Sequence, residues 1–340
     1  MDAERAKYFD LYRQALTSTT RCPETAQGRG IVTCGSQKFA PYLFILIKSL
    51  RHHGCTLPIE LWHMDGEINE PLKQWLEPYG VTFKDGGALS WGRNRLFNGA
   101  HGIKPYSVVH SGFREVLFLD ADNSVCADPT FLFETPEYRQ SGALFWSDPV
   151  AATTKLGAAD LRKDFGLEPG GEEFESGQFV VDKTRAWSAL MLTLHLNERS
   201  GYYYRHLFGD KETFRMGFDA VRQPYVLATQ PKNIPDRDWL HKGHVQYWID
   251  GTPLFFHRVG RKWEIIVTRQ ENHDLSHLPP ALVSEIFEEL QRRWPEVMPL
   301  RERARPYLGV MRRTLQPMWI RPYFKWLTSL MRVYTDRGRR

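Results

Sequence analysis

The chain has 340 residues, of which 42% are apolar and 25% charged, a composition that indicates a folded protein and excludes a disordered one. Its four cysteines show no paired C-x-x-C spacing, so we expect reduced thiols rather than a disulfide framework. Residues 301–340 hold 11 Lys and Arg and 2 acids, so this end carries +9 while the remaining residues sum to −4. A basic end on a slightly acidic body indicates an anionic partner for that end alone.

The amino end shows no secretory-signal pattern, because its first 25 residues are polar and lack an apolar core segment. The most apolar window, Phe39–Leu50, is too short to span a bilayer and contains Lys48. From these two observations we expect a cytoplasmic protein.

From residue 28 onward, short apolar runs alternate with amphipathic stretches. Strands that alternate with helices form right-handed βαβ units, so the sequence predicts an α/β fold with an open, mostly parallel sheet flanked by helices. The predicted strands are Ile31–Cys34, Pro58–His63, Val81–Lys84, Val116–Leu119, Ala143–Ser147, the end of Glu175–Asp182, and Thr252–His257. The predicted helices are 3–17, 39–52, 69–79, 104–112, 186–203 and one that follows Pro280.

We predict three parts from this pattern. They are an amino-terminal helix and linker over residues 1–27, a catalytic domain over residues 28–278, and a helical, basic extension over residues 279–340. Within the catalytic domain, residues 85–103 are expected to form a loop beside the site and residues 151–171 a linker.

Two carboxylates, Asp120 and Asp122, follow directly on the apolar run Val116–Leu119. In a mainly parallel sheet, ligands bind beyond the carboxyl ends of the strands. Residues two apart on an extended chain share a side, so both carboxylates can address one ion. Oxygen ligands of this kind bind Mg²⁺ or Mn²⁺ and leave positions for substrate phosphates. The alternative is a solvated turn at the end of the strand.

The same residues also fit the nucleophile motif of haloacid-dehalogenase-type phosphatases, in which Asp120 would form an aspartyl-phosphate. That class places the motif on its first strand, whereas three strands are predicted to come before it here. It also needs a later acidic pair, and the nearest candidate, at Asp210, has no second aspartate at its end. A phosphatase therefore stays the alternative function.

His257 ends another apolar strand and is followed by Arg261 and Lys262. A histidine at such a position is often structural. A cation already held by carboxylates can also accept its imidazole nitrogen, and a mixed oxygen and nitrogen set suits Mn²⁺ better than Ca²⁺. Lys262 would then help to neutralise a diphosphate.

Six motifs together resemble the fungal α-1,3-mannosyltransferase family and its bacterial relatives, over roughly residues 28–265. They are Gly30-Ile-Val-Thr-Cys, Lys104-Pro-Tyr, Leu117-Phe-Leu-Asp120-Ala-Asp122, Glu175-Ser-Gly-Gln178, Gly209-Asp210-Lys-Glu212 and Phe255-Phe-His257. The segment from His257 to Trp263 is also similar, more loosely, to the closing motif of glycogenin-type and lipopolysaccharide galactosyltransferases. The fungal enzymes carry an amino-terminal membrane anchor, and we expect none in this chain. The resemblance therefore does not imply residence in a secretory organelle.

The resemblance implies a GT-A fold, a nucleotide-sugar donor, retention of configuration and a glycan or lipid-linked saccharide acceptor. GDP-mannose is the donor it favours, and a UDP-sugar is the alternative. It further implies a bound metal ion, Mn²⁺ or Mg²⁺, with three protein ligands. The implied roles are metal binding for Asp120, Asp122 and His257; donor contacts for Thr33, Cys34, Lys104, Asp120 and Lys262; and contacts to the sugar and acceptor for Glu175, Gln178, Asp210 and Glu212.

Each of these residues also has a simpler interpretation. Ser176 and Gly177 can merely form a turn, Asp210 can cap a helix, Lys104 can be a surface charge, and Thr33 can simply end a strand.

The basic extension contains an amphipathic pattern with one apolar and one basic side. The apolar residues Ile320, Phe324, Leu327, Met331 and Tyr334 follow a 4-3-4-3 spacing. Such a helix suits the anionic inner face of a cell membrane, so we expect peripheral attachment through residues 301–340. The alternatives are a helix packed on the catalytic domain and a nucleic-acid-binding arm, and we expect no nucleic acid partner. A non-enzymatic membrane module would explain this extension but not the carboxylates.

Overall fold

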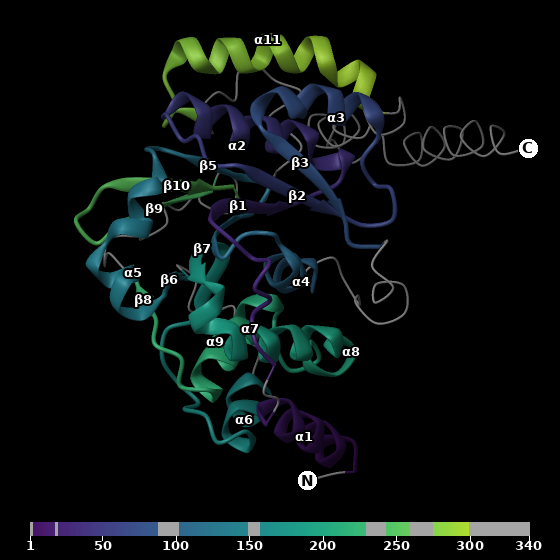
Figure 1. The fold of residues 1–340 in the computed structure, drawn as a ribbon, viewed down its shortest axis with the longest axis vertical. Coiled ribbons are helices and arrows are strands. Elements are labelled where there is room, and N and C mark those ends of the chain that lie inside the picture. The colour runs from purple at the N-terminus through teal and green to yellow at the C-terminus, as the bar shows by residue number, and fades with distance from the viewer. Residues whose placement is uncertain are drawn as a thin grey trace, which may run out of the picture. The chain divides into compact units, whose positions relative to one another are not determined.

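The computed structural model describes residues 3–17, 20–87, 102–148, 157–228, 243–258 and 275–298. The chain forms two compact units, Met1–Gly260 and Arg261–Arg340. The first unit is built on a seven-stranded sheet with helices on both faces (Figure 1). Its strands are β1 (Arg29–Cys34), β2 (Ile59–His63), β3 (Val81–Asp85), β4 (Glu115–Leu119), β6 (Ala143–Ser147), β7 (Phe174–Asp182) and β8 (Val226–Leu227).

The strand order is β3-β2-β1-β4-β7-β6-β8. Strands β3, β2, β1 and β4 run parallel to one another, and β6 is parallel to β8. Strand β7 runs antiparallel to both β4 and β6. The predicted α/β class with a mostly parallel sheet is therefore confirmed, with one reversed strand that the sequence pattern did not reveal.

Two layers cover the sheet. The described helices of the first unit are α1 (Ala3–Leu16), α2 (Ala40–His52), α3 (Glu70–Leu76), α4 (Ile103–His110), α5 (Pro136–Ser141), α6 (Gly157–Asp164), α7 (Lys183–Glu198), α8 (Ser200–Tyr203) and α9 (Asp210–Ala220). Helices α4, α7 and α9 pack on one face, and α2 lies on the other together with a second, smaller sheet (Figure 1). Short 3-10 turns occur at Gln37–Phe39, Glu77–Tyr79 and Pro129–Glu134.

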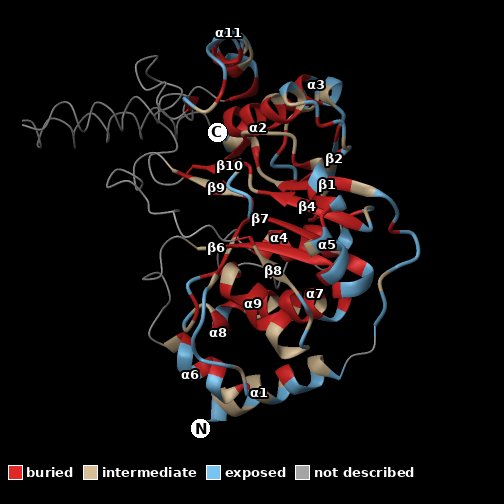
Figure 2. Cartoon of the chain, turned by 90° about the vertical axis from the view of Figure 1, so that its left-hand side faces the viewer, coloured by how far each residue is buried: buried red, intermediate tan, exposed pale blue. Residues whose placement is uncertain are grey.

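Strand β4 lies inside the sheet, and all five of its residues are buried (Figure 2). Val116 and Phe118 belong to the core cluster formed with α4, α7 and α9, and the Phe118 ring stacks on that of Phe179 at 5.0 Å between centroids. Burying an apolar side chain of this size contributes about 1.5–3 kcal/mol. The unbroken apolar run of this strand is thus explained by cover on both faces.

The smaller sheet is antiparallel and joins β5 (Asn123–Val125), β10 (Pro253–His257) and β9 (His244–Tyr247) in that order. Strands β9 and β10 form a hairpin whose turn contains Gly251, with φ +90°. A left-handed φ at this position favours glycine. The smaller sheet brings residues from far along the chain next to the segment that follows β4.

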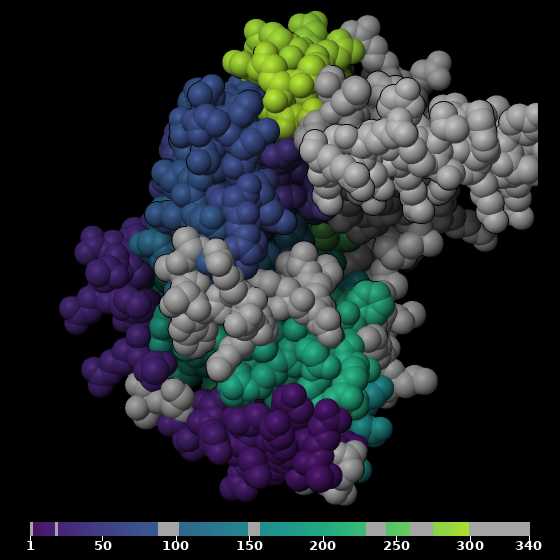
Figure 3. All heavy atoms as spheres, turned by 90° about the vertical axis from the view of Figure 1, so that its right-hand side faces the viewer, coloured from purple at the N-terminus to yellow at the C-terminus, as the bar shows by residue number. Residues whose placement is uncertain are grey.

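The amino-terminal helix α1 packs within the first unit. Tyr8 stacks on Tyr202 at 3.9 Å between ring centroids, and Tyr12 stacks on Phe165 at 4.1 Å. Figure 3 shows the purple α1 against the teal helical layer. The predicted helix at residues 3–17 is confirmed as Ala3–Leu16.

Two local predictions were wrong, and one helix was left out of the predicted elements. The expected linker at residues 151–171 contains α6, whose Ala158 and Leu161 are buried in a cluster with α1. The single helix expected over residues 186–203 is α7 followed by α8, divided near Arg199. Helix α9 was considered only as the helix that Asp210 could cap. In the first and last cases the helix is stabilised by packing on distant segments, which local periodicity does not report.

In the second unit the structure describes α11 (Pro280–Val297). Its apolar stripe of Leu282, Ile286, Leu290 and Trp294 is buried, as the spacing predicted. The two compact units divide after Gly260, whereas the predicted boundary lies at residue 279, so that boundary stays a prediction. Residues 301–340 lie outside the described part of the chain. Among the described helices, none combines the length and the apolar character needed to cross a bilayer.

Close packing of α7 on α9 gives the first prediction. A Cβ added at Gly217 would lie 2.7 Å from the carbonyl oxygen of Ala189 and would also clash with the Thr193 hydroxyl. Gly217→Ala is therefore expected to lower the free energy of unfolding by about 1–3 kcal/mol, measured by urea denaturation. Gly170→Ala is the matched control, because a Cβ there meets no described atom within 4 Å. Equal stability of the two variants would contradict the close packing.

Candidate active site

The two predicted aspartate ligands lie at the carboxyl end of β4, where the chain turns. The backbone amide of Asp120 donates to the carbonyl of Gly177 on β7 at 2.7 Å, and the backbone amide of Asn123 donates to the Asp120 carbonyl at 3.0 Å. This turn leads into β5 and holds both carboxylates beyond the carboxyl end of β4.

His257 reaches the aspartates because β10 pairs with β5. In this pairing His257 lies opposite Asn123, and the Arg258 amide donates to the carbonyl of Asp122 at 3.1 Å. His257 Nε2 is 3.4 Å from Oδ1 of Asp122 and 4.0 Å from Oδ2 of Asp120. The structure thus brings together the three residues that the sequence predicted as metal ligands.

The donor atoms of Asp120, Asp122 and His257 fit a divalent cation. One ligand atom from each residue lies within 4.8 Å of the other two. Two carboxylates and one imidazole form a mixed oxygen and nitrogen set, which suits Mn²⁺, and the carboxylate pair also suits Mg²⁺. Burial raises the pKa of Asp120, and the nearby Asp122 charge adds to this effect. A bound cation would offset the cost of keeping these charges together.

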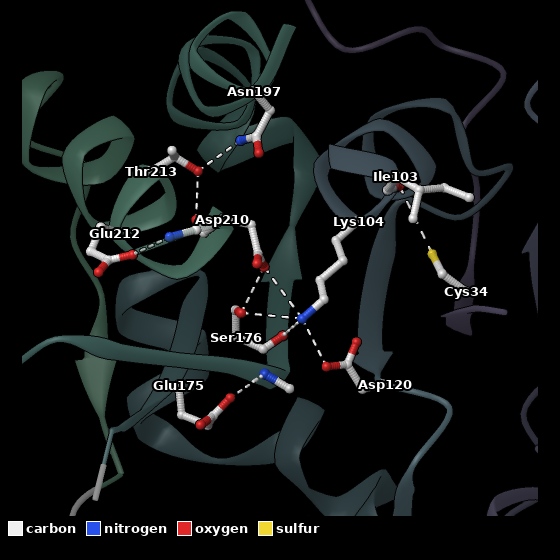
Figure 4. Close-up of polar contacts among 12 residues, drawn as sticks. Cys34, Ile103, Lys104, Asp120, Glu175, Ser176, Asn197, Asp210, Glu212 and Thr213 are labelled. Atoms are coloured by element: carbon white, nitrogen blue, oxygen red, sulfur yellow. Dashed lines mark hydrogen bonds and ion pairs between the residues drawn. The ribbon is translucent and has the colours of Figure 1, made fainter. Parts of the chain in front are cut away.

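Lys104, on α4, is the centre of an adjoining group of polar contacts (Figure 4). Its Nζ donates to Oδ2 of Asp120 at 2.7 Å and to the hydroxyl of Ser176 at 3.2 Å, and it lies 3.3 Å from Oδ2 of Asp210. Burial alone would lower the pKa of Lys104, but Asp120 and Asp210 raise it above its ordinary value. Lys104 is 9% exposed, so the surface-charge interpretation is wrong.

The start of β7 lines the site with Glu175, Ser176 and Gly177. Glu175 Oε1 accepts from the Gly177 amide at 2.8 Å and lies 3.6 Å from Nδ1 of His257. The Ser176 hydroxyl donates to Oδ2 of Asp210 at 2.7 Å. A Cβ at Gly177 would lie 2.6 Å from Cε1 of His257. Glycine at this position therefore permits the close approach of the histidine ring to β7.

Asp210 and Glu212 stand in the first turn of α9 but have different contacts (Figure 4). The Glu212 carboxylate accepts from the amides of Phe208 at 3.2 Å and Gly209 at 3.0 Å, so it caps the helix. Burial raises the pKa of Glu212 to about 7. The capping interpretation considered for Asp210 thus applies to Glu212, and the Asp210 side chain faces Lys104 instead.

Thr33 and Cys34 lie at the end of β1, as predicted. Thr33 is fully buried, and its hydroxyl has no hydrogen-bond partner among the described residues. Cys34 Sγ lies 3.1 Å from the Ser107 hydroxyl, and burial raises the pKa of the thiol to about 12. The structure therefore places a protonated thiol here. Contact of these residues with a nucleotide stays a prediction.

Gln178 is fully buried on β7, and neither atom of its amide has a hydrogen-bond partner within the described part of the chain. The adjacent Phe179 packs into the core cluster of α4, α7 and α9, so strand alternation places Gln178 on the opposite face. Its role toward a sugar stays a prediction. Lys262 lies outside the described residues.

Sequence reasoning missed His244, which lies opposite His257 in the pairing of β9 with β10. The two rings are 5.4 Å apart between centroids. A signal was available, because Asp250-Gly251 between two strand-like runs is typical of a hairpin turn. A hairpin prediction would have placed His244 beside His257.

A family model with the description "Mannosyltransferase putative" matches residues 28–161 and 158–238, more than half of the chain. The chain belongs to this mannosyltransferase family. The matched residues include Asp120, Asp122 and Asp210, whereas His244 and His257 follow them in the sequence. Membership supports glycosyl transfer as the activity and confirms the family predicted from the motifs.

Curated relatives of the chain are yeast enzymes. The α-1,2-mannosyltransferase MNN5 of Saccharomyces cerevisiae (strain YJM789) is 26% identical over 259 residues, 58% of this chain and 44% of that protein. The α-1,2-mannosyltransferase MNN2 of Candida albicans is 26% identical over 257 residues, 60% of this chain and 42% of that protein. The chain thus spans less than half the length of these relatives. Their names state an α-1,2 linkage, which differs from the α-1,3 linkage of the family first recognised in the motifs.

Solved glycosyltransferases show a weaker likeness. The galactosyltransferase LgtC, crystallised with donor and acceptor sugar analogues, has a TM-score of 0.44 at 16% identity and covers 59% of this chain and 73% of its own. The mannosyltransferase Ktr4p of Saccharomyces cerevisiae, crystallised with GDP, has a TM-score of 0.38 at 11% identity and covers 64% of this chain and 75% of its own. The family assignment rests on the sequence match.

The Lys104 cluster gives the second prediction. Removing the ammonium leaves Asp120 and Asp210 facing each other in a largely buried site, which typically costs about 3–5 kcal/mol. Lys104→Met should therefore lower the free energy of unfolding by this order in urea denaturation. Adding Asp210→Asn to Lys104→Met should restore part of the loss, because one of the unpaired charges disappears.

Lys73→Met is the matched control for this prediction. Lys73 is partly exposed and pairs with Glu70 at 3.7 Å within one helix, a contact expected to contribute less than about 1 kcal/mol. Strictly additive losses in the Lys104→Met/Asp210→Asn variant would show that the three charges do not act together.

Proposed function

We propose that the protein is a metal-dependent, retaining glycosyltransferase that moves mannose from GDP-mannose to a glycan or a lipid-linked saccharide. A UDP-sugar is the alternative donor. The observation that carries the proposal is the cluster of Asp120, Asp122 and His257 at the end of β4, in a chain of a mannosyltransferase family. The proposal covers formation of either an α-1,2 or an α-1,3 linkage.

In this proposal Asp120, Asp122 and His257 hold Mn²⁺ or Mg²⁺. The ion would supply Lewis-acid stabilisation of the negative charge on the departing diphosphate. The oxygen-rich half of the cluster suits an ion that shares its coordination with phosphate oxygens. Asp120 also accepts from Lys104, so one carboxylate joins the metal group to the contacts made by α4 and β7.

A retaining transfer breaks the bond between the sugar C1 and the diphosphate oxygen and forms the new bond on the same face. The proton of the acceptor hydroxyl passes to the leaving diphosphate oxygen. The sugar becomes cation-like on the way, so a fixed negative group beside it stabilises the transition state. Asp210 is the favoured residue for this role, because Lys104 and Ser176 hold its carboxylate in place. Gln178 is the second candidate, because its amide is neutral and offers only the partial negative charge of its oxygen.

The third prediction concerns Asp122. Asp122→Asn removes a charged ligand, so Mn²⁺-dependent binding of GDP should weaken by at least about 100-fold in calorimetry, since even the loss of an outer partner of a metal ligand costs about 10–100-fold. Transfer of mannose should fall with it, while the circular dichroism spectrum stays unchanged. A calorimetric panel of GDP- and UDP-sugars with Mn²⁺ identifies the donor in the same experiment.

Asp128→Asn is the control for charge loss alone. Asp128 caps the turn at Pro129–Glu134 by accepting from the Thr130 amide at 3.0 Å, and asparagine is an equally good cap. Full transferase activity in excess chelator would refute metal dependence. Trapping of an aspartyl-phosphate analogue on Asp120 with a phosphate-mimicking fluoride would instead favour the phosphatase.

The fourth prediction concerns residues 301–340, which we propose attach the protein to the anionic inner face of a cell membrane. Each basic residue near such a surface contributes about 1 kcal/mol, enough in sum for reversible attachment. The full chain should float with liposomes that contain anionic lipid at low salt, and a chain ending at Pro299 should not. Equal flotation of both chains, or of neither, would remove the membrane proposal.

A further inference from the structure

Glu175, His244 and His257 form a second cluster of metal-ligating side chains beside the aspartates. One ligand atom from each of the three lies within 4.8 Å of the other two. Glu175 Oε1 and His257 Nδ1 are 3.6 Å apart, close to the separation of about 3.3 Å between two ligands bound tetrahedrally at 2.0–2.1 Å. Three strands supply the three residues: β7, β9 and β10.

His244 is a buried imidazole that lacks a hydrogen bond. It is 7% exposed, and neither of its ring nitrogens has a hydrogen-bond partner among the residues that the structure describes. An unsatisfied polar group of this kind typically costs about 1–3 kcal/mol. A neutral imidazole ring has one nitrogen with a lone pair available for a ligand.

The two nitrogens of His257 face different carboxylates. Nε2 is 3.4 Å from Oδ1 of Asp122, whereas Nδ1 is 3.6 Å from Oε1 of Glu175. One histidine thus lies between two groups of ligands. The aspartate group is rich in oxygen, and the group with His244 has two imidazoles and one carboxylate.

We propose that Glu175, His244 and His257 form a second divalent-cation site that takes Zn²⁺, using the ring nitrogen of His257 that faces away from the aspartates. Two histidines and one glutamate are a recurrent ligand set for zinc, with the fourth position open to water. Imidazole ligands favour Zn²⁺ over Mn²⁺, while carboxylate ligands suit Mn²⁺ and Mg²⁺. The adjoining groups therefore differ in the metal that they prefer.

Sharing His257 makes the two sites mutually exclusive. A neutral imidazole has one lone pair and one N–H. As long as the ring stays neutral, binding of Zn²⁺ at Nδ1 leaves the proton on Nε2, which then cannot bind an ion held by Asp120 and Asp122. Zn²⁺ is therefore expected to displace Mn²⁺ and to inhibit any activity that needs it. Zinc binding itself does not depend on the proposed transferase function, whereas the competition does.

The experiment titrates the full chain, free of metal, with Zn²⁺ alone and with Mn²⁺ alone by calorimetry. Wild type should bind one Zn²⁺, and His244→Ala should weaken this by at least about 100-fold, because a direct ligand is lost. Mn²⁺ binding to His244→Ala should stay within about threefold of wild type, which also shows that the variant is folded. Asp122→Asn should give the reverse pattern, with Zn²⁺ retained and Mn²⁺ lost.

Co²⁺ provides a spectroscopic readout that needs no activity. Bound by Glu175, His244 and His257 with one water, it should show the intense visible absorption of a tetrahedral ion, and this band should disappear in His244→Ala. His195→Ala is the matched control, because His195 is a partly buried histidine of α7 whose Nε2 also has no hydrogen-bond partner among the described residues. This control should bind Zn²⁺ and Co²⁺ as wild type does.

Unchanged Zn²⁺ affinity in His244→Ala would overturn the proposal, and so would the absence of Zn²⁺ binding to wild type. Loss of Zn²⁺ in Asp122→Asn but not in His244→Ala would assign zinc to the aspartates and also overturn it. Simultaneous binding of one Zn²⁺ and one Mn²⁺ to wild type would refute mutual exclusion. If Zn²⁺ binding follows the expected pattern while Mn²⁺ binds nowhere, only the proposed function fails.

Discussion

The structure of the site depends on the compensation of buried negative charge. Asp120, Asp122, Glu175 and Asp210 gather around Lys104 and His257, at the edge of a sheet whose interior is apolar. Charges in such surroundings are stable only when they are paired or bind metal. Lys104 compensates Asp120 and Asp210 directly. The carboxylates nearer His257 are left to share an imidazole, which explains why the region favours a cation.

The reversed strand β7 determines which side chains meet Lys104. Because β7 runs antiparallel to β4, its first residues lie beside the end of β4, and the Gly177 carbonyl accepts from the Asp120 amide. A parallel strand in this position would bring its carboxyl end here instead. The reversal therefore brings Ser176 to Lys104 and Glu175 to His257. Helix α9 then adds Asp210, whose carboxylate contacts Ser176 and Lys104 while Glu212 caps the helix.

The fold could be predicted from the sequence to the extent that its signals are local. The apolar run Val116–Leu119 followed by Asp120 and Asp122 specifies a buried strand with two carboxylates after its end, and the structure agrees. The direction of β7 and the helix α6 depend on contacts with distant segments, so periodicity does not report them. His257 was predicted as a ligand through a family resemblance, because nothing local distinguishes it from a structural histidine. His244 was missed because only the hairpin of β9 and β10, which was not predicted, brings it next to His257.

The smaller sheet completes the site, although it lies mostly outside the part of the chain that matches the family. Residues 28–238 contain both aspartates, and β5 begins immediately after them. Strand β10 pairs with β5 and contributes His257, and β9 pairs with β10 and contributes His244. The position of His257 beside the aspartates is therefore fixed by the register of β5 with β10. A shift of one residue in that register would turn His257 to the other face of the smaller sheet. If the proposed sites bind metal, the smaller sheet supplies their imidazoles, whereas the carboxylates come from β7 and from the segment that follows β4.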